Sequence, residues 1–358
     1  MRIGIIGAGQ LGQMLGFAAR KLGHKCYFLD PSDAPPAAKA GPVVQASFDD
    51  RVALSILADK CDVLTYEFEN IPVAALEDIA GATPIYPPLD ALRLAQDRLT
   101  EKQLFKQLNI PLPGYQAIDS PEDLVRAAEA IGLPLVIKTR RLGYDGKGQF
   151  VLHDPGQIEA AWEELAGNDL IAEQWVKFDY EVSAIGARNV QGDIANYCLT
   201  RNEHADGILR VSRAPVDDAQ LSRKADQYMQ AMLEHLDYVG VLALELFVVG
   251  EKLLANEYAP RVHNSGHWTI EGAETSQFSN HILAISGEKP GRTANIGHAG
   301  MVNLIGQIPD AVSELSDAKL HDYGKSARPG RKLGHLTVIA DSADDRDALV
   351  QQIKKTVT

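Results

Sequence analysis

Two apolar segments, each interrupted by one glutamate and joined by only two residues, restrict the fold of this chain more than any other pattern. Val241–Val249 carries Glu245 and Lys252–Tyr258 carries Glu257, and the Gly-Glu pair between them is typical of a hairpin turn. A carboxylate in a buried strand is costly unless a cation or several hydrogen-bond donors compensate it. Two such carboxylates beside the amide of Asn256 predict a hard oxygen site for magnesium, although edge-strand glutamates facing solvent would show the same alternation.

The register of this hairpin is a separate prediction. Glu245 and Glu257 are an even number of positions apart, so they can lie directly cross-strand on the same face. A plain two-residue turn would instead place Glu245 opposite Asn256. Because one metal ion needs both carboxylates within a few ångströms, we expect the two glutamates to pair, through an odd loop such as residues 250–252 or through a bulge.

The segment after the hairpin concentrates polar side chains of several kinds. Residues 259–267 contain a guanidinium, two imidazoles, an amide and a hydroxyl, in an irregular stretch of the type that often binds ligands. Arg261, His263 and Asn264 suit a small planar anion, because a guanidinium and polar donors can hold it. His263 and His267 also imitate the spacing of a zinc pair, but the residues between them form helix poorly and no third ligand is evident, so His267 is expected to support the loop.

The first 95 residues have the pattern of a Rossmann-like unit. A strand over 1–6, a glycine turn over 7–12, a helix over 13–22 and a strand over 25–30 follow one another, and the second strand ends in Asp30. Taken literally, this motif predicts NAD with Asp30 on its ribose, but a phosphate held at the helix N-terminus fits the same turn. A third strand over 62–69 ends in Glu67 and Glu69 near the edge where ligands bind in such sheets.

A second glycine-rich loop lies between two further predicted strands. The strand over 133–138 ends in Lys138, and residues 143–149 alternate glycine with polar side chains before a strand over 150–152. Such a loop can cover phosphates with its N–H groups while Lys138 supplies a point charge, although an ordinary hairpin with a surface lysine has the same pattern. Neither a P-loop nor the catalytic motifs of protein kinases accompany it. The strand over 170–176 and the following Glu181 could hold an adenine and its ribose.

Composition excludes several classes of protein. The chain has 358 residues, 45% of them hydrophobic, which is enough for two or three domains with their own cores. Its net charge of -13 argues against a general nucleic-acid binder. Three widely spaced cysteines, no secretory signal pattern and no apolar run of membrane-spanning length predict a cytoplasmic protein without membrane contact. The basic run from Lys325 to Lys332 fits either a solvated loop or a binding site for a phosphate.

In their order along the chain, these motifs resemble the ATP-grasp superfamily and, within it, the 5-(carboxyamino)imidazole ribonucleotide synthetase family. The blocks that carry the resemblance are residues 9–12, 65–70, 97–98, 102–105, 143–149, 256–268 and 328–335. The resemblance implies an α/β (α+β) chain in three parts. They are a Rossmann-like pre-ATP-grasp domain over 1–96, an ATP-grasp domain over 97–288 with a nucleotide-covering lid over 115–182, and a small C-terminal domain over 289–358.

The family resemblance also implies an activity: a homodimeric carbon–nitrogen ligase that uses ATP and bicarbonate to carboxylate aminoimidazole ribonucleotide in bacterial purine synthesis. One or two magnesium ions would be held by Glu245 and Glu257. Catalytic roles fall to Lys138, Asp145, Arg261 and His263, with Asp145 available for the amine proton. The implied ATP-binding residues are Arg98, Lys138, Gly143, Tyr144, Asp145, Gly146, Lys147, Gly148, Gln149, Glu173, Gln174, Trp175, Val176, Glu181, His204, Asn256 and Glu257. The implied substrate-binding residues are Gly9, Gln10, Leu11, Glu67, Tyr144, Asp145, Arg261, His263, Asn264, Ser265, Lys325, Arg331 and Lys332.

The residues are also compatible with three alternative functions. An NAD-dependent oxidoreductase would explain the first glycine turn but neither the acidic hairpin nor the second glycine loop. Another ATP-grasp ligase, of the biotin carboxylase or ribonucleotide transformylase type, would share the hairpin but not the combination of residues 261–267 with 328–332. A non-catalytic nucleotide-binding module would not need Lys138 together with Glu245, Asn256 and Glu257.

Overall fold

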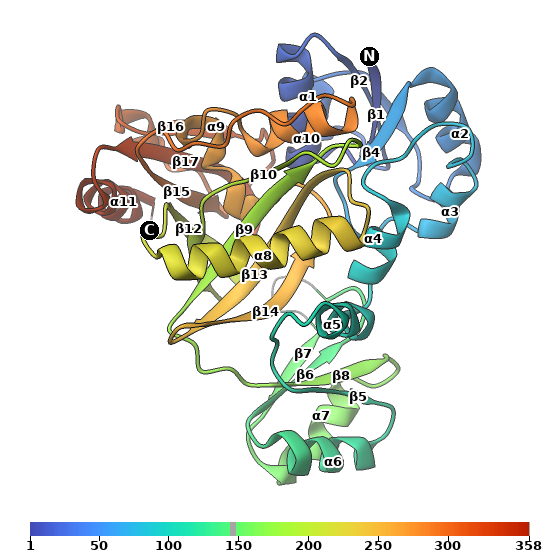
Figure 1. The fold of residues 1–358 in the computed structure, drawn as a ribbon, viewed down its shortest axis with the longest axis vertical. Coiled ribbons are helices and arrows are strands. Elements are labelled where there is room, and N and C mark those ends of the chain that lie inside the picture. Colours follow the sequence, from blue (N-terminus) through green and yellow to red (C-terminus); the bar gives the residue numbers. More distant parts are fainter. Residues whose placement is uncertain (144–147, 358) are drawn as a thin grey trace.

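The computed structural model describes residues 1–143 and 148–357, which form three sheets (Figure 1). The first sheet is parallel, with its strands in the order β3-β2-β1-β4. Its elements and the helices around it are β1 (Arg2–Ile6), α1 (Gln10–Lys21), β2 (Lys25–Asp30), β3 (Val43–Gln45), α2 (Arg51–Lys60), β4 (Val63–Tyr66), α3 (Val73–Glu77) and α4 (Leu89–Ala95). The Rossmann-like unit is therefore confirmed. The strand expected over 62–69 ends at Tyr66, so Glu67 and Glu69 lie in the loop after it.

The second sheet belongs to a small lobe at the bottom of Figure 1, below α5 (Arg98–Gln107). Its strands are antiparallel, in the order β5-β8-β6-β7. The elements are β5 (Tyr115–Ile118), α6 (Pro121–Ile131), β6 (Leu135–Thr139), β7 (Gln149–Leu152), α7 (Ile158–Glu164) and β8 (Leu170–Gln174). Helices α6 and α7 bury one face of this sheet in a core that includes Leu124, Leu135 and Leu152. The other face is left for the cavity described below, which Val136 and Lys138 line.

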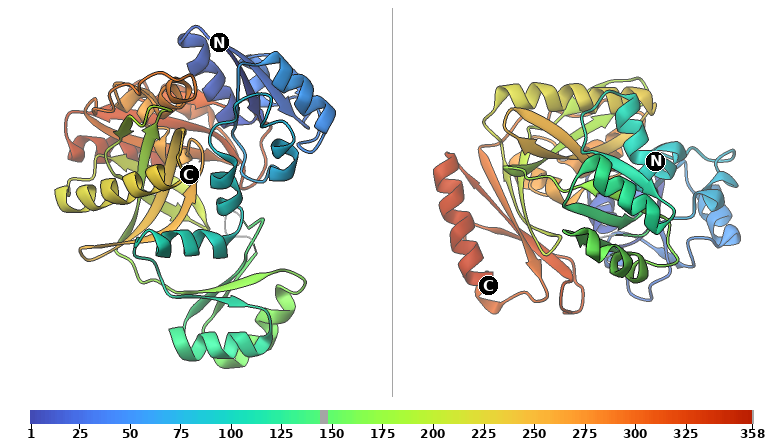
Figure 2. Two further views of the ribbon diagram at one scale, coloured as in Figure 1. Left: turned by 45° about the vertical axis from the view of Figure 1, so that its right-hand side comes forward. Right: turned by 90° about the horizontal axis from the view of Figure 1, so that it is seen from below.

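Within the described residues, the third sheet has nine strands, in the order β14-β13-β9-β11-β12-β15-β17-β16 with β10 beside β9. Its elements and helices are β9 (Tyr180–Arg188), β10 (Ile194–Asn196), β11 (Thr200–Ala205), β12 (Ile208–Ala214), α8 (Ala219–His235), β13 (Gly240–Val249), β14 (Lys252–Ala259), α9 (Thr269–Gly272), α10 (Gln277–Ile285), β15 (His298–Ile305), β16 (Lys319–Asp322), β17 (Lys332–Ala340) and α11 (Ala343–Val357). Because β15 pairs with β12, the C-terminal strands extend the sheet that contains the hairpin (Figure 2). The domain limits at residues 96 and 288 stay predictions.

Strand β13 is apolar along most of its length because helices cover both of its faces. Leu242, Leu244 and Leu246 belong to the core beneath α8, whereas Val241 and Ala243 belong to the core beneath α10. Since side chains alternate along a strand, Glu245 lies on the α10 face. That face borders the cavity at Glu245 and Phe247.

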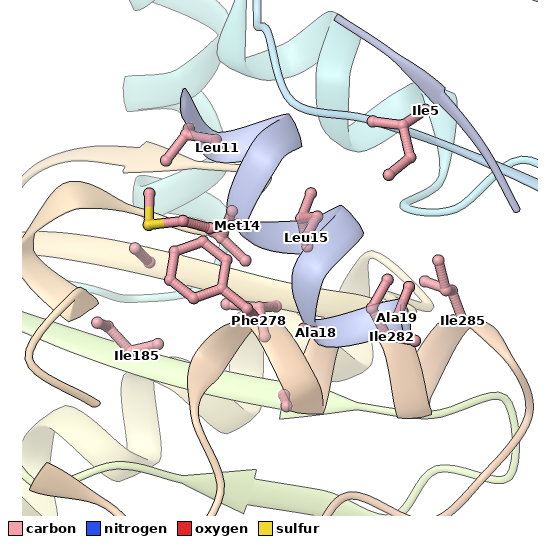
Figure 3. Packing of buried hydrophobic residues seen from close by; sticks show 14 of the residues in the cluster. Ile5, Leu11, Met14, Leu15, Ala18, Ala19, Ile185, Phe278, Ile282 and Ile285 are labelled. Atoms are coloured by element: carbon pink, nitrogen blue, oxygen red, sulfur yellow. The ribbon is translucent and has the colours of Figure 1, made fainter. Parts of the chain in front are cut away.

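Helix α1 of the first unit packs directly on α10 of the third sheet (Figure 3). The apolar stripe of α1, which includes Leu11, Met14 and Leu15, meets Phe278 and Ile282 in one continuous buried core. Each such side chain contributes roughly 1.5–3 kcal/mol when fully buried, so this interface is substantial. It fixes the first glycine turn, at the N-terminus of α1, relative to the nine-stranded sheet.

A buried histidine on α10 adds a polar link to the same interface. The Nε2 atom of His281 lies 2.8 Å from the Thr65 hydroxyl of β4, and its Nδ1 accepts the Val241 N–H of β13 at 3.1 Å. Burial lowers the pKa of His281 to about 3, so the imidazole is neutral and the Val241 N–H fixes its tautomer. His281 therefore joins β4 to β13 across the boundary between the two units.

Candidate active site

A cavity of about 440 Å³ lies where the nine-stranded sheet, α5 and the sheet of the small lobe meet. The predicted residues that line it are Arg98, Lys138, Gly143, Gly148, Gln149, Trp175, Glu181, His204, Glu245, Asn256, Glu257, Arg261, His263 and Lys332. Predicted residues outside its lining are Gly9, Gln10, Leu11, Glu67, Glu173, Gln174, Val176, Asn264, Ser265, Lys325 and Arg331. Tyr144, Asp145, Gly146 and Lys147, also predicted, lie outside the described residues. The fold thus gathers side chains from distant parts of the sequence into one cavity.

The acidic hairpin has the expected register, and a bulge produces it. Glu245 pairs with Glu257, while Val249 pairs with Lys252 across a two-residue turn. The register shifts between Glu245 and Leu246, because Leu246 pairs with Ala255 and Asn256 is the extra residue. Without this bulge the two-residue turn would set Glu245 opposite Asn256. The prediction that both carboxylates share one face is confirmed, by the bulge and not by a three-residue loop.

The two hairpin carboxylates influence each other electrostatically. Burial and the nearby Glu257 charge raise the pKa of Glu245 to about 7. Desolvation also opposes ionisation of Glu257, but Arg98, Lys138 and Lys102 outweigh it and hold the pKa of Glu257 below its usual value. Two paired carboxylates on a cavity wall, one destabilised by the other, are a donor set that fits a hard divalent cation.

Three cations on one side of the hairpin, Arg98, Lys138 and Lys102, are arranged around Glu257 and the buried Glu173. The Arg98 guanidinium lies 3.0 Å from Glu257, and the Lys138 ammonium lies 2.8 Å from Glu173. Burial by itself would raise the pKa of Glu173. The positive charges of Lys102 and Lys138 outweigh burial and lower this pKa to about 2. Burial lowers the pKa of Lys138, while Glu173 opposes that shift. The Glu173 side chain, predicted at the nucleotide, thus neutralises the two lysines, and any nucleotide contact from this residue remains a prediction.

The far end of the cavity combines an aromatic surface with a carboxylate–imidazole pair. Trp175 is 47% exposed and lines the cavity together with Phe247. Glu181 accepts a hydrogen bond from Nδ1 of His204. Burial disfavours the charged imidazole, but this bond and the Glu245 charge raise the pKa of His204 above its ordinary value. An apolar wall beside polar groups suits an adenosine.

The loop after the hairpin places two predicted residues beside the carboxylates. The Arg261 guanidinium lies 2.9 Å from Glu69, and Nε2 of His263 lies 3.2 Å from Glu245. Burial lowers the pKa of His263 well below its usual range, and nearby Arg261 lowers it further. Since the Ser265 N–H donates to Nδ1 of His263, the neutral ring carries its proton on Nε2, the atom that lies 3.2 Å from Glu245. Glu69 also lines the cavity, and its position two residues after Glu67 in an acidic segment was the signal that could have marked it.

The rest of this loop is held from behind the cavity. Asn264 exchanges hydrogen bonds with Asn303 at 3.1 and 2.7 Å. His267 is buried, lies 3.2 Å from the Gln277 amide nitrogen and packs on Phe278 and His335. These contacts give His267 the supporting role that the sequence predicts.

The first glycine turn is already occupied by the chain's own carboxylates. The Ala8 N–H donates to Asp30 at 2.8 Å, and the Gly9 N–H donates to Glu67 at 2.7 Å. Asp30 also accepts the Ser32 N–H at 2.9 Å and is buried, so it is not open to a ribose. A Cβ atom at Gly9 would lie 2.9 Å from the Glu67 carboxylate, which explains the glycine there. The feature that favoured NAD is therefore used to build the turn.

The residues of the basic run from Lys325 to Lys332 lie at two different parts of the structure. Lys325 donates a hydrogen bond to the Gln10 side chain at the start of α1, while Lys332 lines the cavity. Arg331 donates to the Ser326 backbone and hydroxyl oxygens at 3.2 and 2.9 Å. Burial, followed by the charge of Arg331, lowers the pKa of Lys325 to about 8. The run thus contributes one lysine to the start of α1 and another to the cavity.

Two further buried residues were missed as functional candidates. Glu101 and Lys102 on α5 are almost fully buried, and both contact the backbone of β14 around Glu257. Lys102 belonged to a block of the family resemblance without a role, and Glu101 directly precedes that block. A charged pair on the apolar side of a predicted helix is the signal that could have identified them.

Comparison with known proteins assigns each part of the chain to a described family. Three family models match: the ribonucleotide synthetase preATP-grasp domain over residues 1–96, the ATP-grasp domain over 103–278, and the phosphoribosylaminoimidazole carboxylase C-terminal domain over 299–349. The chain is 47% identical over 340 residues to the N5-carboxyaminoimidazole ribonucleotide synthase of Pseudomonas aeruginosa, covering 94% of both chains. It is 38% identical over 351 residues to the enzyme of that name from Bacillus subtilis, covering 96% of this chain and 92% of that one.

Solved structures give the same result. The N5-carboxyaminoimidazole ribonucleotide synthetase of Thermus thermophilus superposes with a TM-score of 0.96 at 47% identity, over 99% of this chain and 98% of that one. The N5-carboxyaminoimidazole synthase of Aspergillus clavatus, in complex with ADP and 5-aminoimidazole ribonucleotide, superposes with a TM-score of 0.91 at 31% identity, over 99% of this chain and 98% of that one.

Proposed function

The chain belongs to the N5-carboxyaminoimidazole ribonucleotide synthase family, and from that membership we infer its reaction. It is an ATP-dependent carbon–nitrogen ligase that carboxylates 5-aminoimidazole ribonucleotide to N5-carboxyaminoimidazole ribonucleotide in purine biosynthesis. We propose bicarbonate as the source of the carboxyl group. The observation that carries the assignment best is one cavity that combines the paired carboxylates, the lysine–arginine cluster and the Arg261–His263 loop.

In the first step, a bicarbonate oxygen attacks the γ-phosphorus of ATP and ADP leaves, which gives carboxyphosphate. Arg98 and Lys138 stand on the cavity wall where they would stabilise the charge of the phosphoryl group during transfer. Trp175, Glu181 and His204 would hold the adenosine, and the 143–149 loop would cover the phosphates. Arg261 would hold bicarbonate against the γ-phosphate, since guanidinium and carboxylate geometries match.

In the second step, the exocyclic amine of the ribonucleotide attacks the carboxyl carbon, the bond from that carbon to the phosphate oxygen breaks, and inorganic phosphate leaves. The amine loses a proton, for which we propose Asp145 as the acceptor. His263, whose Nε2 lies 3.2 Å from Glu245, would orient this region of the site. The phosphate end of the ribonucleotide would be bound by Gln10, Lys325, Arg331 and Lys332, beside Glu67.

We propose that Glu245 and Glu257 bind magnesium, as one or two ions. The support is the pairing of the two carboxylates and the raised pKa of Glu245, which burial and the second negative charge cause. When bound, magnesium would polarise the phosphoryl oxygens of ATP. The donor set is all oxygen, which suits magnesium better than a transition metal.

A two-part assay tests the proposed function. Purified protein is incubated with ATP, magnesium and ¹⁴C-bicarbonate, with and without aminoimidazole ribonucleotide, and both phosphate release and acid-labile fixed carbon are measured. We expect phosphate release to rise when the ribonucleotide is added, with fixed carbon appearing in proportion. A biotin carboxylase-like enzyme would respond to biotin instead, and a transformylase would need formate. Phosphate release that ignores the ribonucleotide would contradict the assignment.

We further propose that the protein is a cytoplasmic homodimer that binds neither membrane nor nucleic acid. Among the described residues, no helix is long and apolar enough to cross a bilayer. The three cysteines are free, as expected in a reducing compartment. The dimer rests on the family resemblance, and light scattering after size exclusion tests it: a single-chain mass at micromolar concentration would contradict it.

A further inference from the structure

Strand β14 is the end strand of the nine-stranded sheet, and its outer edge is covered by α5 and the residues after it. An uncovered edge would leave backbone groups without partners. The Ala255 N–H donates to the Pro111 carbonyl at 2.7 Å. The Asn256 carbonyl accepts a hydrogen bond from Lys102, and the Tyr258 N–H donates to the Glu101 carboxylate at 2.7 Å. The backbone is therefore held on both sides of Glu257.

These contacts come from one face of one helix. Arg98, Glu101 and Lys102 occupy positions i, i+3 and i+4 of α5, which lie side by side on a helix surface. Arg98 contacts the Glu257 side chain, while Glu101 and Lys102 contact the backbone of its neighbours. One turn of α5 thus holds the side chain and the flanking backbone of a single residue.

The position of this contact coincides with the bulge. Asn256 is the extra residue of β14, and its carbonyl is the group that Lys102 binds. In a regular two-residue hairpin, a shift of one residue moves every following side chain to the opposite face. Loss of the bulge would therefore turn Glu257 away from Glu245 and from the cavity.

The two α5 residues also need each other. The Lys102 ammonium lies 3.2 Å from Glu101 and 3.8 Å from Glu173, and neither Glu101 nor Lys102 is more than 2% exposed. A buried charge without its partner is strongly destabilising, so the pair tolerates little displacement. This makes the pair a stiff support for the strand it holds.

We propose that Glu101 and Lys102 are positioning residues that lock the Asn256 bulge and thereby keep Glu257 paired with Glu245 on the cavity face. Their contacts to β14 stand on geometry alone, whereas the consequence for a bound metal–nucleotide complex rests on the proposed function. Glu101 lies at the cavity wall and Lys102 lies behind it, and both contact the backbone of β14 through their charged groups.

Backbone amide exchange measured by NMR or mass spectrometry tests the lock directly. In Lys102→Met, we expect the amides of residues 255–258 to exchange about tenfold faster or more than in the wild type, because one buried charge-assisted bond is lost. The amides of β13 at 241–244 should keep their protection. Lys106→Met, an exposed lysine on the same helix, is the matched control and should exchange like the wild type. A folded Lys102→Met protein with unchanged exchange at 255–258 would overturn the proposal.

A pair of Glu101 variants decides the question if Lys102→Met does not fold. Glu101→Ala removes the acceptor of the Tyr258 N–H, whereas Glu101→Gln retains one. We expect faster exchange at Tyr258 in Glu101→Ala and protection restored in Glu101→Gln. Equal exchange in both variants would contradict the lock.

Steady-state kinetics adds a readout that simple destabilisation would not give. Lys102→Met should raise the KM for magnesium–ATP about tenfold or more while the KM for the ribonucleotide changes less than about twofold. An equal rise in both constants would argue for general damage to the site and against a positioning role. If the wild type shows no ribonucleotide-dependent phosphate release, the proposed function fails, but amide exchange still tests the lock.

Discussion

Two pairs of acidic side chains in this protein look alike in the sequence and have opposite surroundings in the structure. Asp30 is the last residue of β2 and Glu67 directly follows β4, and they accept N–H groups of the first glycine turn at 2.8 and 2.7 Å. Glu245 and Glu257 face each other across the hairpin, where one meets a neutral imidazole and the other a guanidinium. The first pair accepts backbone N–H groups, while the second lines a cavity and contacts an imidazole and a guanidinium.

The difference shows that an acid near a ligand-binding edge does not define a site until its donors are known. Backbone N–H groups that bind a carboxylate stabilise its charge and leave little capacity for a ligand. At the hairpin, the Arg98 guanidinium contacts Glu257, whereas Glu245 meets a neutral imidazole and the charge of Glu257 opposes its ionisation, so a further cation would be stabilising. We therefore interpret the glycine turn as a structural support, whereas the hairpin is the site that we propose binds a cation.

The largest effect that would sharpen this contrast is expected for Glu257→Gln. The substitution keeps the size of the side chain and should preserve the fold, but it removes one of the paired charges. We expect kcat to fall on the order of 10²–10³-fold. The exposed turn residue offers a control in Glu251→Gln, which should retain full activity. Near-normal, magnesium-dependent turnover by a Glu257→Gln enzyme would remove the metal role from the hairpin.

Substitutions in the basic run from Lys325 to Lys332 should weaken binding of the ribonucleotide and not of ATP. Lys332→Ala and Arg331→Ala each remove a cation proposed to bind the ribonucleotide phosphate, and a charge-assisted hydrogen bond is worth ~1.5–3 kcal/mol. We expect the KM for the ribonucleotide to rise about tenfold or more, with ATP affinity unchanged. Lys319→Ala, an exposed lysine of β16, serves as the control. If both variants keep wild-type ribonucleotide kinetics, this run is a solvated surface loop.

A smaller, pH-dependent effect is expected from Lys325. Burial and the neighbouring cations lower its pKa to about 8, so the ammonium form predominates below that pH and is lost above it. If the cation binds the ribonucleotide phosphate, kcat/KM for the ribonucleotide should fall several-fold as the pH rises from about 7 to 9. Lys325→Arg keeps its charge over this range and should flatten the profile. The same alkaline fall in the arginine variant would assign it to another group.

The smallest effect is expected when Glu67, which accepts an N–H group of the glycine turn, is replaced by a neutral side chain that can still accept that hydrogen bond. Glu67→Gln can still accept the Gly9 N–H, so we expect a change in unfolding free energy below about 1 kcal/mol in urea titrations. Glu67→Ala leaves that N–H without its partner and should cost ~1–3 kcal/mol. Should Glu67→Gln destabilise the fold as much as Glu67→Ala, the negative charge itself would be needed in the turn.

Much of the fold and of the candidate site could be predicted from the sequence because local sequence patterns determine it. The glycine turn before α1, the strand that carries Lys138 and the hairpin with its paired glutamates all follow from alternation and turn residues. Helix α2 was not predicted, although Asp50 caps it through the N–H groups of Val52 and Ala53.

The partners of the acids could not be predicted in the same way. Lys102 reaches Asn256 across more than 150 positions, and Lys325 reaches Gln10 across more than 300. Contacts of this kind depend on how the units pack and leave no periodic signal in the sequence. The location of the bulge belongs to the same class, since the sequence left an odd loop equally open.

Binding of manganese in place of magnesium, followed by electron paramagnetic resonance with saturating ADP, tests the contrast between the two acidic pairs most directly. We expect the wild type and Glu67→Gln to bind manganese with the same affinity, and Glu245→Gln and Glu257→Gln to bind it at least about tenfold more weakly. Wild-type affinity in both hairpin variants, or an equal loss in Glu67→Gln, would contradict the account.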